Sequence, residues 1–90
     1  MQRRIEGFIW REWVIEKLLA RHAVTADEVE EVFFNSPLKV RKASSGKYLL
    51  YGTSDSGRYL FVVFGWVETK VRVITARDMT KAERRFLLGR

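Results

Sequence analysis

Residues 58–77, RYLFVVFGWVETKVRVITAR, contain the pattern that decides the fold. The first part, Arg58–Gly65, is apolar at both odd and even positions, which is typical of a strand covered on both faces. The second part, Lys70–Thr75, alternates, because two valines flank Arg72. The connector between them is short. The two segments are therefore predicted to form an antiparallel pair, with the first one central in the sheet.

Two more strands are predicted upstream of this pair, at Leu38–Lys42 and Lys47–Tyr51. The turn-like residues 44–46 (Ser-Ser-Gly) and 53–57 (Thr-Ser-Asp-Ser-Gly) separate the successive strands. Short connectors between neighbouring strands predict a four-stranded antiparallel meander.

Helices are expected on both sides of the strands. Residues 10–22 carry apolar side chains three and four positions apart, which predicts an amphipathic helix with Trp10, Trp13, Val14 and Leu18 on its inward face. Capping boxes at Thr-Ala-Asp-Glu (25–28) and Thr-Lys-Ala-Glu (80–83) open two further helices. The first of these helices is acidic and ends before Pro37. The predicted fold is α+β, with two N-terminal helices, the four-stranded sheet and a C-terminal helix in one domain over residues 1–90.

Composition and charge restrict the function. The 90 residues include one histidine and no cysteine, so a thiolate metal site or a disulfide is excluded and no metal or other cofactor is expected. Residues 1–36 hold five basic and seven acidic residues (net −2), whereas residues 37–90 hold twelve basic and four acidic ones (net +8). A half this basic attracts nucleic acid or an acidic protein. No signal peptide or membrane-spanning run is evident, so the cytoplasm is the expected location.

Three blocks of motifs cover most of the chain. The first block contains Trp10, His22, Val24-Thr25 and Glu28…Val32-Phe33. The second block contains Lys47-Tyr48, Tyr51-Gly52, Gly57-Arg58-Tyr59-Leu60 and Val62-Val63-Phe64. The third and most specific block contains Val71-Arg72-Val73-Ile74-Thr75-Ala76-Arg77 and Thr80…Glu83-Arg84-Arg85. Together, over residues 10–86, these blocks resemble the BrnT family, the toxins of bacterial type II toxin–antitoxin pairs.

This resemblance implies a RelE-like fold and a metal-independent ribonuclease activity. It also implies a cognate antitoxin of the ribbon-helix-helix type that forms a hetero-oligomer with the toxin, so that DNA is contacted only through the antitoxin. The chain departs from the family pattern on its first helix, where Arg11, Val14 and Leu18 stand in place of Asp, Lys and Asn. Ala23 and Lys47 replace a family glycine and arginine. The acidic residues of the second helix are expected to form a solvated face or to meet a basic antitoxin segment.

Four residues are candidates for catalysis. Arg77 ends the fourth strand, where its guanidinium can bind a phosphate, although an ion pair with Asp78 or Glu83 would also explain it. Arg72 lies opposite the inward valines of that strand. Glu83 is a candidate base, although its role in the capping box would equally explain its presence. His22 titrates near neutrality but sits at a helix C-terminus, where it can interact with the helix dipole.

Four more residues are candidates for binding RNA. Lys47 and Arg58 begin neighbouring strands, so they are predicted to line one cleft, and Arg84 follows Glu83 on the last helix. Tyr48 is a candidate for stacking on a base, although aromatic residues on strands more often form core pairs. Two hypotheses follow: a ribonuclease toxin that cleaves by 2′-hydroxyl attack, or a catalytically degenerate protein of the same fold that binds antitoxin or RNA.

Overall fold

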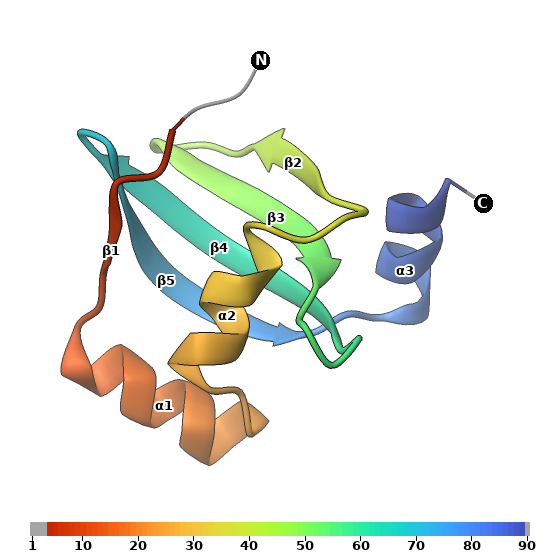
Figure 1. Cartoon of the computed structure of the whole chain (residues 1–90), viewed down its shortest axis with the longest axis horizontal. Coiled ribbons are helices and arrows are strands. Elements are labelled where there is room, and N and C mark those ends of the chain that lie inside the picture. The colour runs from red at the N-terminus through yellow and green to blue at the C-terminus, as the bar shows by residue number, and fades with distance from the viewer. Residues whose placement is uncertain (1–3, 90) are drawn as a thin grey trace.

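The computed structural model describes residues 4–89 of the chain (Figure 1). Its elements in chain order are β1 (Gly7–Ile9), α1 (Glu12–His22), α2 (Ala26–Val32), β2 (Lys39–Lys42), β3 (Lys47–Thr53), β4 (Tyr59–Val67), β5 (Lys70–Asp78) and α3 (Lys81–Leu88). The α+β class, the three helices and four of the five strands agree with the sequence-based prediction. No helix within residues 4–89 is long and apolar enough to cross a membrane.

The sheet has five strands in the order β1-β5-β4-β3-β2. Strands β2 to β5 form the predicted antiparallel meander, and β4 is central as predicted. The prediction of a purely antiparallel, four-stranded sheet is wrong, because β1 pairs with β5 in parallel. Strand β1 contains only Gly-Phe-Ile, which is too short for alternation to reveal it in the sequence.

Helices α1 and α2 cover one side of the sheet, which we call the core face (Figure 1). The predicted inward residues Val14 and Leu18 are buried here, but Trp13 is 59% exposed, so that part of the predicted apolar face is wrong. Trp10 precedes α1 and is half-buried. The main core consists of Val14, Leu18, Val24, Val29, Val32, Phe33, Leu50, Leu60, Val62, Phe64, Val71, Val73 and Ala76.

The acidic residues of α2 anchor this helix. The predicted capping box is present, since the Thr25 side chain accepts a hydrogen bond from the Glu28 amide and Glu28 accepts one from the Thr25 amide. Glu30 accepts a hydrogen bond from Trp10 Nε1 at 2.7 Å, and Glu31 accepts one from the amide of Asp55 at 2.9 Å. Two of these carboxylates therefore connect α2 to two other segments, the one before α1 and the β3–β4 connection, in addition to meeting solvent.

A β-bulge in β5 decides where its arginines point. Val63 pairs with Thr75 and Phe64 pairs with Val73, so Ile74 is an extra residue. Before the bulge Val73 faces the core, and after it Ala76 does. Without the bulge, alternation would place Arg72 and Arg77 on opposite faces. The bulge instead turns both of them to the side opposite the core.

Candidate functional site

The side of the sheet opposite α1 and α2 gathers basic and aromatic residues, and we call it the basic face. Alternation along the strands assigns to it the side chains of Lys39, Arg41, Lys47, Leu49, Tyr51, Tyr59, Phe61, Val63, Arg72 and Arg77. Helix α3 covers one end of this face, where Phe86 packs edge-on against Tyr51 with ring centroids 4.9 Å apart. Thus the two sides of one sheet differ in chemistry: one is a hydrophobic core, and the other carries positive charge.

Arg72 and Lys47 flank Gly65 on the basic face. Gly65 pairs with Lys47 on β3 and with Arg72 on β5. A β-carbon at Gly65 would lie 3.6 Å from the Gly46 carbonyl oxygen and 3.8 Å from Arg72 Nη2, so the guanidinium group and the β2–β3 turn both lie beside this buried glycine. Neither cation forms a hydrogen bond or ion pair with any of residues 4–89. This end of the face therefore presents two positive charges that no carboxylate neutralises.

Arg77 lies on the same face but is paired. Its Nη1 and Nη2 atoms donate to the two carboxylate oxygens of Glu83 at 2.8 and 2.9 Å, and its guanidinium lies 4.3 Å from the centre of the Phe61 ring. The hydrogen bonds from Arg77 hold the pKa of Glu83 below its ordinary value, so Glu83 is ionised at neutral pH. Glu83 also completes the predicted capping box with Thr80. Since Phe61 and Gly65 are four residues apart on β4, Arg77 and Arg72 are separated by roughly 13 Å along the face.

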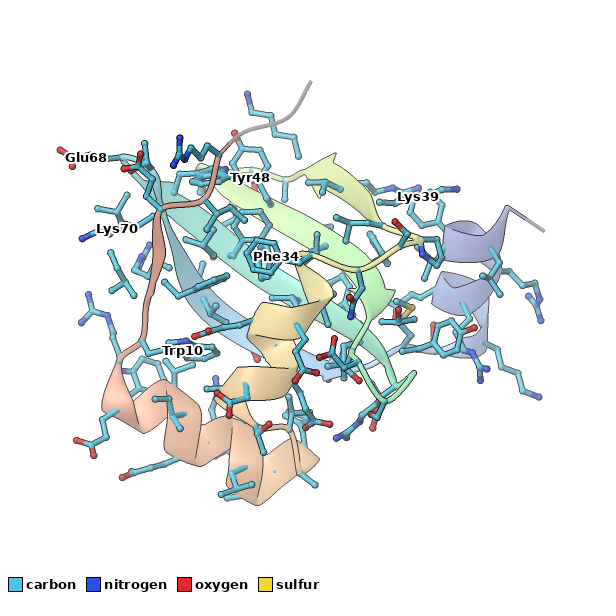
Figure 2. The ribbon with its side chains drawn as sticks, viewed as in Figure 1. Trp10, Phe34, Lys39, Tyr48, Glu68 and Lys70 are labelled. Atoms are coloured by element: carbon cyan, nitrogen blue, oxygen red, sulfur yellow. The ribbon has the colours of Figure 1, made fainter. Side chains whose placement is uncertain are left out.

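Helix α3 adds cations around its aromatic contact. The guanidinium of Arg41 and the Nζ atom of Lys39 lie 4.1 and 4.7 Å from the Phe86 ring centre, and Lys39 donates to the Phe86 carbonyl at 2.6 Å (Figure 2). Arg84, a predicted phosphate-binding residue, places its guanidinium 4.3 Å from the Tyr59 ring centre. Lys39 and Arg41 were not among the predicted site residues. Strict alternation of side chains along Leu38–Lys42 would have predicted that Lys39 and Arg41 lie on the face opposite Val40.

Arg58 lies at the opposite end of the sheet from Lys47. Because β3 and β4 are antiparallel, Lys47 pairs with the residue at position 65, so the starts of the two strands lie at opposite ends of the sheet. The prediction that Lys47 and Arg58 line one cleft is therefore wrong.

The contacts of Arg58 explain its presence. It donates to both carboxylate oxygens of Asp78, to Glu28 and to the backbone carbonyls of His22 and Ala23. Five hydrogen bonds use all five donors of a guanidinium. The bond to Arg58 is also the main reason why the pKa of Asp78 lies below its ordinary value. Arg58 therefore connects the C-terminal end of α1 to α2 and to the end of β5.

The structure does not bring His22 or Tyr48 to the basic face. The His22 carbonyl accepts a hydrogen bond from Arg58 Nη2 at 2.9 Å, which places this residue with the Arg58 contacts at the end of α1. Tyr48 lies on the core face and stacks on Phe64, with ring centroids 5.5 Å apart (Figure 2).

A hollow of about 320 Å³ lies next to α2 and is lined by Asp27, Glu30, Glu31 and Phe34.

The residues of the site fit no metal centre. Within residues 4–89, no three His, Cys, Asp or Glu side chains gather closely enough to hold a metal ion. The chemistry that the basic face offers is the binding of a polyanion by guanidinium and ammonium groups over an aromatic surface, with one ionised carboxylate at its edge.

Comparisons with known proteins identify the family. Among curated protein sequences, none matches the chain significantly. Among solved structures, the crystal structure of the Brucella abortus ribonuclease toxin, BrnT, is similar to it, with a TM-score of 0.69, 22% sequence identity, and coverage of 83% of this chain and 97% of that one. Residues 10–83 match the sequence model of a family described as the ribonuclease toxin BrnT of type II toxin–antitoxin systems. The chain therefore belongs to the BrnT family.

Proposed function

We propose that this protein is a ribonuclease toxin that binds RNA on the basic face and cleaves it without a metal ion. The observation that carries the proposal is the arrangement on that face, where the unpaired cations Arg72 and Lys47 flank Gly65 and the Arg77–Glu83 pair lies about 13 Å further along the sheet. The family description supports the same activity. We further propose a RelE-like relationship for the fold and a cytoplasmic place of action.

The proposed reaction uses the RNA's own 2′-hydroxyl. Its oxygen attacks the neighbouring phosphorus, and the bond from phosphorus to the 5′-oxygen breaks, leaving a 2′,3′-cyclic phosphate and a 5′-hydroxyl. Arg72 and Lys47 bind phosphates and Arg77 stabilises the charge that develops in the transition state. Glu83 accepts the proton of the 2′-hydroxyl, because of the two candidate bases only Glu83 lies on this side of the sheet. The leaving 5′-oxygen takes a proton from water.

An antitoxin is the proposed protein partner. The family belongs to type II systems, in which the partner of the toxin is a protein. We propose that an antitoxin of the ribbon-helix-helix type forms a hetero-oligomer with this chain and that any contact with DNA is made by the antitoxin. The excess positive charge of residues 37–90 is suited to an acidic antitoxin segment as well as to RNA.

A second candidate function is supported by the first helix. Val14 and Leu18 are 2% and 0% exposed, so the positions that are polar in the family belong to the core here. If the family's activity depends on those polar groups, this chain is a toxin-fold protein that binds RNA or antitoxin without cleavage.

One experiment separates the two candidates. Purified protein is incubated with end-labelled RNA in excess EDTA, and the product ends are identified by mass spectrometry. We expect cleavage to persist and to yield cyclic phosphate ends. Glu83→Gln, which retains the capping geometry, should reduce the rate by about 100-fold or more. Lys81→Ala, an exposed change in the same helix, should not.

Two results would contradict the proposal in different ways. Loss of cleavage in EDTA that added Mg²⁺ restores would show that the reaction needs a metal. An absence of cleavage under all conditions, with RNA binding that weakens as salt is raised, would favour the non-catalytic candidate.

A further inference from the structure

Strand β2 leaves one edge of the sheet without a neighbour among residues 4–89. The Ala43 amide donates to the Lys47 carbonyl at 2.8 Å, so residues 43 and 47 form a hydrogen-bonded pair. Such pairs alternate along antiparallel strands, so Arg41 and Lys39 bond to β3 whereas Val40 and Lys42 do not. The backbone N–H and C=O groups of Val40 and Lys42 therefore point outward and can pair with another strand.

Large apolar side chains lie next to this edge. Val40 is 52% exposed and Leu38 39% exposed, and alternation places both on the core-face side of β2. Phe34, which is 66% exposed, is not part of this patch, because its ring centroid lies 6.2 Å from that of Phe8 on β1, the strand at the other edge of the sheet. Exposed apolar residues beside an unpaired strand edge favour aggregation. A native protein that combines these two features usually has a binding surface there.

The charge of β2 determines which strand fits there. Three of its four residues are basic, since its sequence is Lys-Val-Arg-Lys. Pairing with the β2 strand of a second copy would place these charges opposite each other, which opposes such a dimer. An RNA strand would satisfy the charges but would leave the outward backbone groups unpaired and the two apolar side chains in water. An extended acidic peptide with apolar residues at alternate positions satisfies all three features.

We propose that the edge of β2 is a docking site for an extended acidic segment of the antitoxin, which pairs with Val40 and Lys42 as a sixth strand. The identity of the partner as an antitoxin rests on the proposed function, whereas the chemistry of the segment rests on β2 itself. In this complex, glutamate or aspartate side chains meet Lys39 and Arg41, which share one side of β2, and apolar ones cover Val40 and Leu38 on the other side.

The test uses the full chain and two eight-residue peptides, one alternating valine with glutamate and the other alternating valine with lysine. Peptide binding is followed by the amide resonances of ¹⁵N-labelled protein. We expect the glutamate peptide to shift the resonances of Val40 and Lys42 and the lysine peptide to have no effect. Val40→Pro removes the outward N–H group without removing a bond to β3, so it should weaken peptide binding by about tenfold or more while the protein stays folded.

Two charge changes provide a second route that does not depend on proline. Arg41→Glu, on the side of β2 that faces the glutamates of the peptide, should weaken binding of the glutamate peptide, and Lys70→Glu, a charge reversal at the other side of the sheet, should not (Figure 2). Failure of the glutamate peptide to shift the β2 resonances at millimolar concentration would overturn the proposal, as would unchanged affinity in both Val40→Pro and Arg41→Glu. Shifts in β2 caused by an RNA oligonucleotide but not by the peptide would assign this edge to nucleic acid instead.

The docking proposal and the proposed function can fail separately. If the wild-type protein does not cleave RNA but binds the glutamate peptide through β2, the docking site stands and the nuclease proposal falls. If Val40→Pro and wild type cleave RNA equally well and bind the peptide equally well, the nuclease proposal stands and the docking site falls.

Discussion

Cationic side chains are paired with carboxylates at one end of β5 and unpaired at the other end. At the C-terminal end, Arg77 forms a bidentate pair with Glu83, and Asp78 accepts two of the five hydrogen bonds donated by Arg58. Near the other end, the side chain of Arg72 forms no hydrogen bond or ion pair with the described part of the chain, residues 4–89, and the side chain of Lys47, across Gly65, forms none either. Each end carries one of the two arginines of β5, Arg72 or Arg77.

This difference shows that the partners of a cation, rather than its place in a basic segment, indicate its role. A guanidinium whose donors are all satisfied by carboxylates and helix-end carbonyls has no donor left for a phosphate, so it stabilises the fold. Neighbouring unpaired cations repel each other and weaken the folded state, unless an external anion binds between them. Arg58 therefore holds the structure together, Arg77 keeps a donor for a phosphate because its hydrogen bonds involve only its two Nη atoms, and the unpaired end is suited to bind RNA.

The largest effect is expected from breaking the paired end. Arg58→Ala leaves Asp78, Glu28 and two carbonyls without their donor, so it should lower the free energy of unfolding by about 2–4 kcal/mol. Urea denaturation followed by circular dichroism measures this change. Arg58→Lys should recover less than half of the loss, because an ammonium cannot reproduce the fork geometry. A stability equal to that of wild type in Arg58→Ala would show that the paired end is not structurally important.

The second largest effect on stability is expected from acid, which should weaken the ion pairs at the paired end. The pKa values of Asp78 and Glu83 are lowered in the folded protein, chiefly by hydrogen bonds from Arg58 and Arg77. A carboxyl with a lowered folded pKa stabilises the protein above its unfolded pKa of about 4, and this stability is lost as the pH falls through the folded value. The urea midpoint should therefore drop steadily below about pH 4.

The control for the acid effect separates the two ends. Asp78→Asn removes one of the two titrating partners, so the drop in its urea midpoint between neutral and acidic pH should be smaller than in wild type. Arg72→Ala removes no ion pair with residues 4–89 and should keep the wild-type profile. An identical pH profile for Asp78→Asn and wild type would contradict this account.

Much of the fold follows from local signals in the sequence. The two capping boxes at Thr25 and Thr80 and the apolar pattern of β4 identify their elements without any tertiary information. Strand β1 was missed because it is defined by its parallel pairing with β5 and not by any pattern of its own.

The candidate site was less predictable. The sequence indicated Arg72 and Arg77 as candidates, but their common face depends on the bulge at Ile74, which no residue pattern announces. The role of Arg58 depends on partners up to 36 residues distant in the chain, so its contacts could not be foreseen either.

A smaller, stabilising effect is expected at Ala23, whose carbonyl accepts a hydrogen bond from Arg58. Ala23 has φ = 52°, a left-handed conformation at the C-terminal cap of α1. A β-carbon is unfavourable in this conformation and glycine is not, so Ala23→Gly should raise the free energy of unfolding by about 0.5–1 kcal/mol. Ala20→Gly, an exposed change inside α1, should instead lower it by about 1 kcal/mol. Equal losses in both variants would show that the cap is not strained.

The smallest effect on stability is expected at the unpaired end. Arg72→Ala should change the free energy of unfolding by less than about 0.5 kcal/mol, because it breaks no hydrogen bond or ion pair with residues 4–89. Its affinity for RNA should nevertheless fall by about tenfold, and the slope of log affinity against log salt should decrease by about 0.7 for each phosphate that the variant no longer neutralises. Arg21→Ala, an exposed change on α1, should leave both quantities unchanged. If Arg72→Ala instead destabilised the fold and kept the wild-type salt slope, the contrast between the two ends of β5 would disappear, since both would then serve the structure.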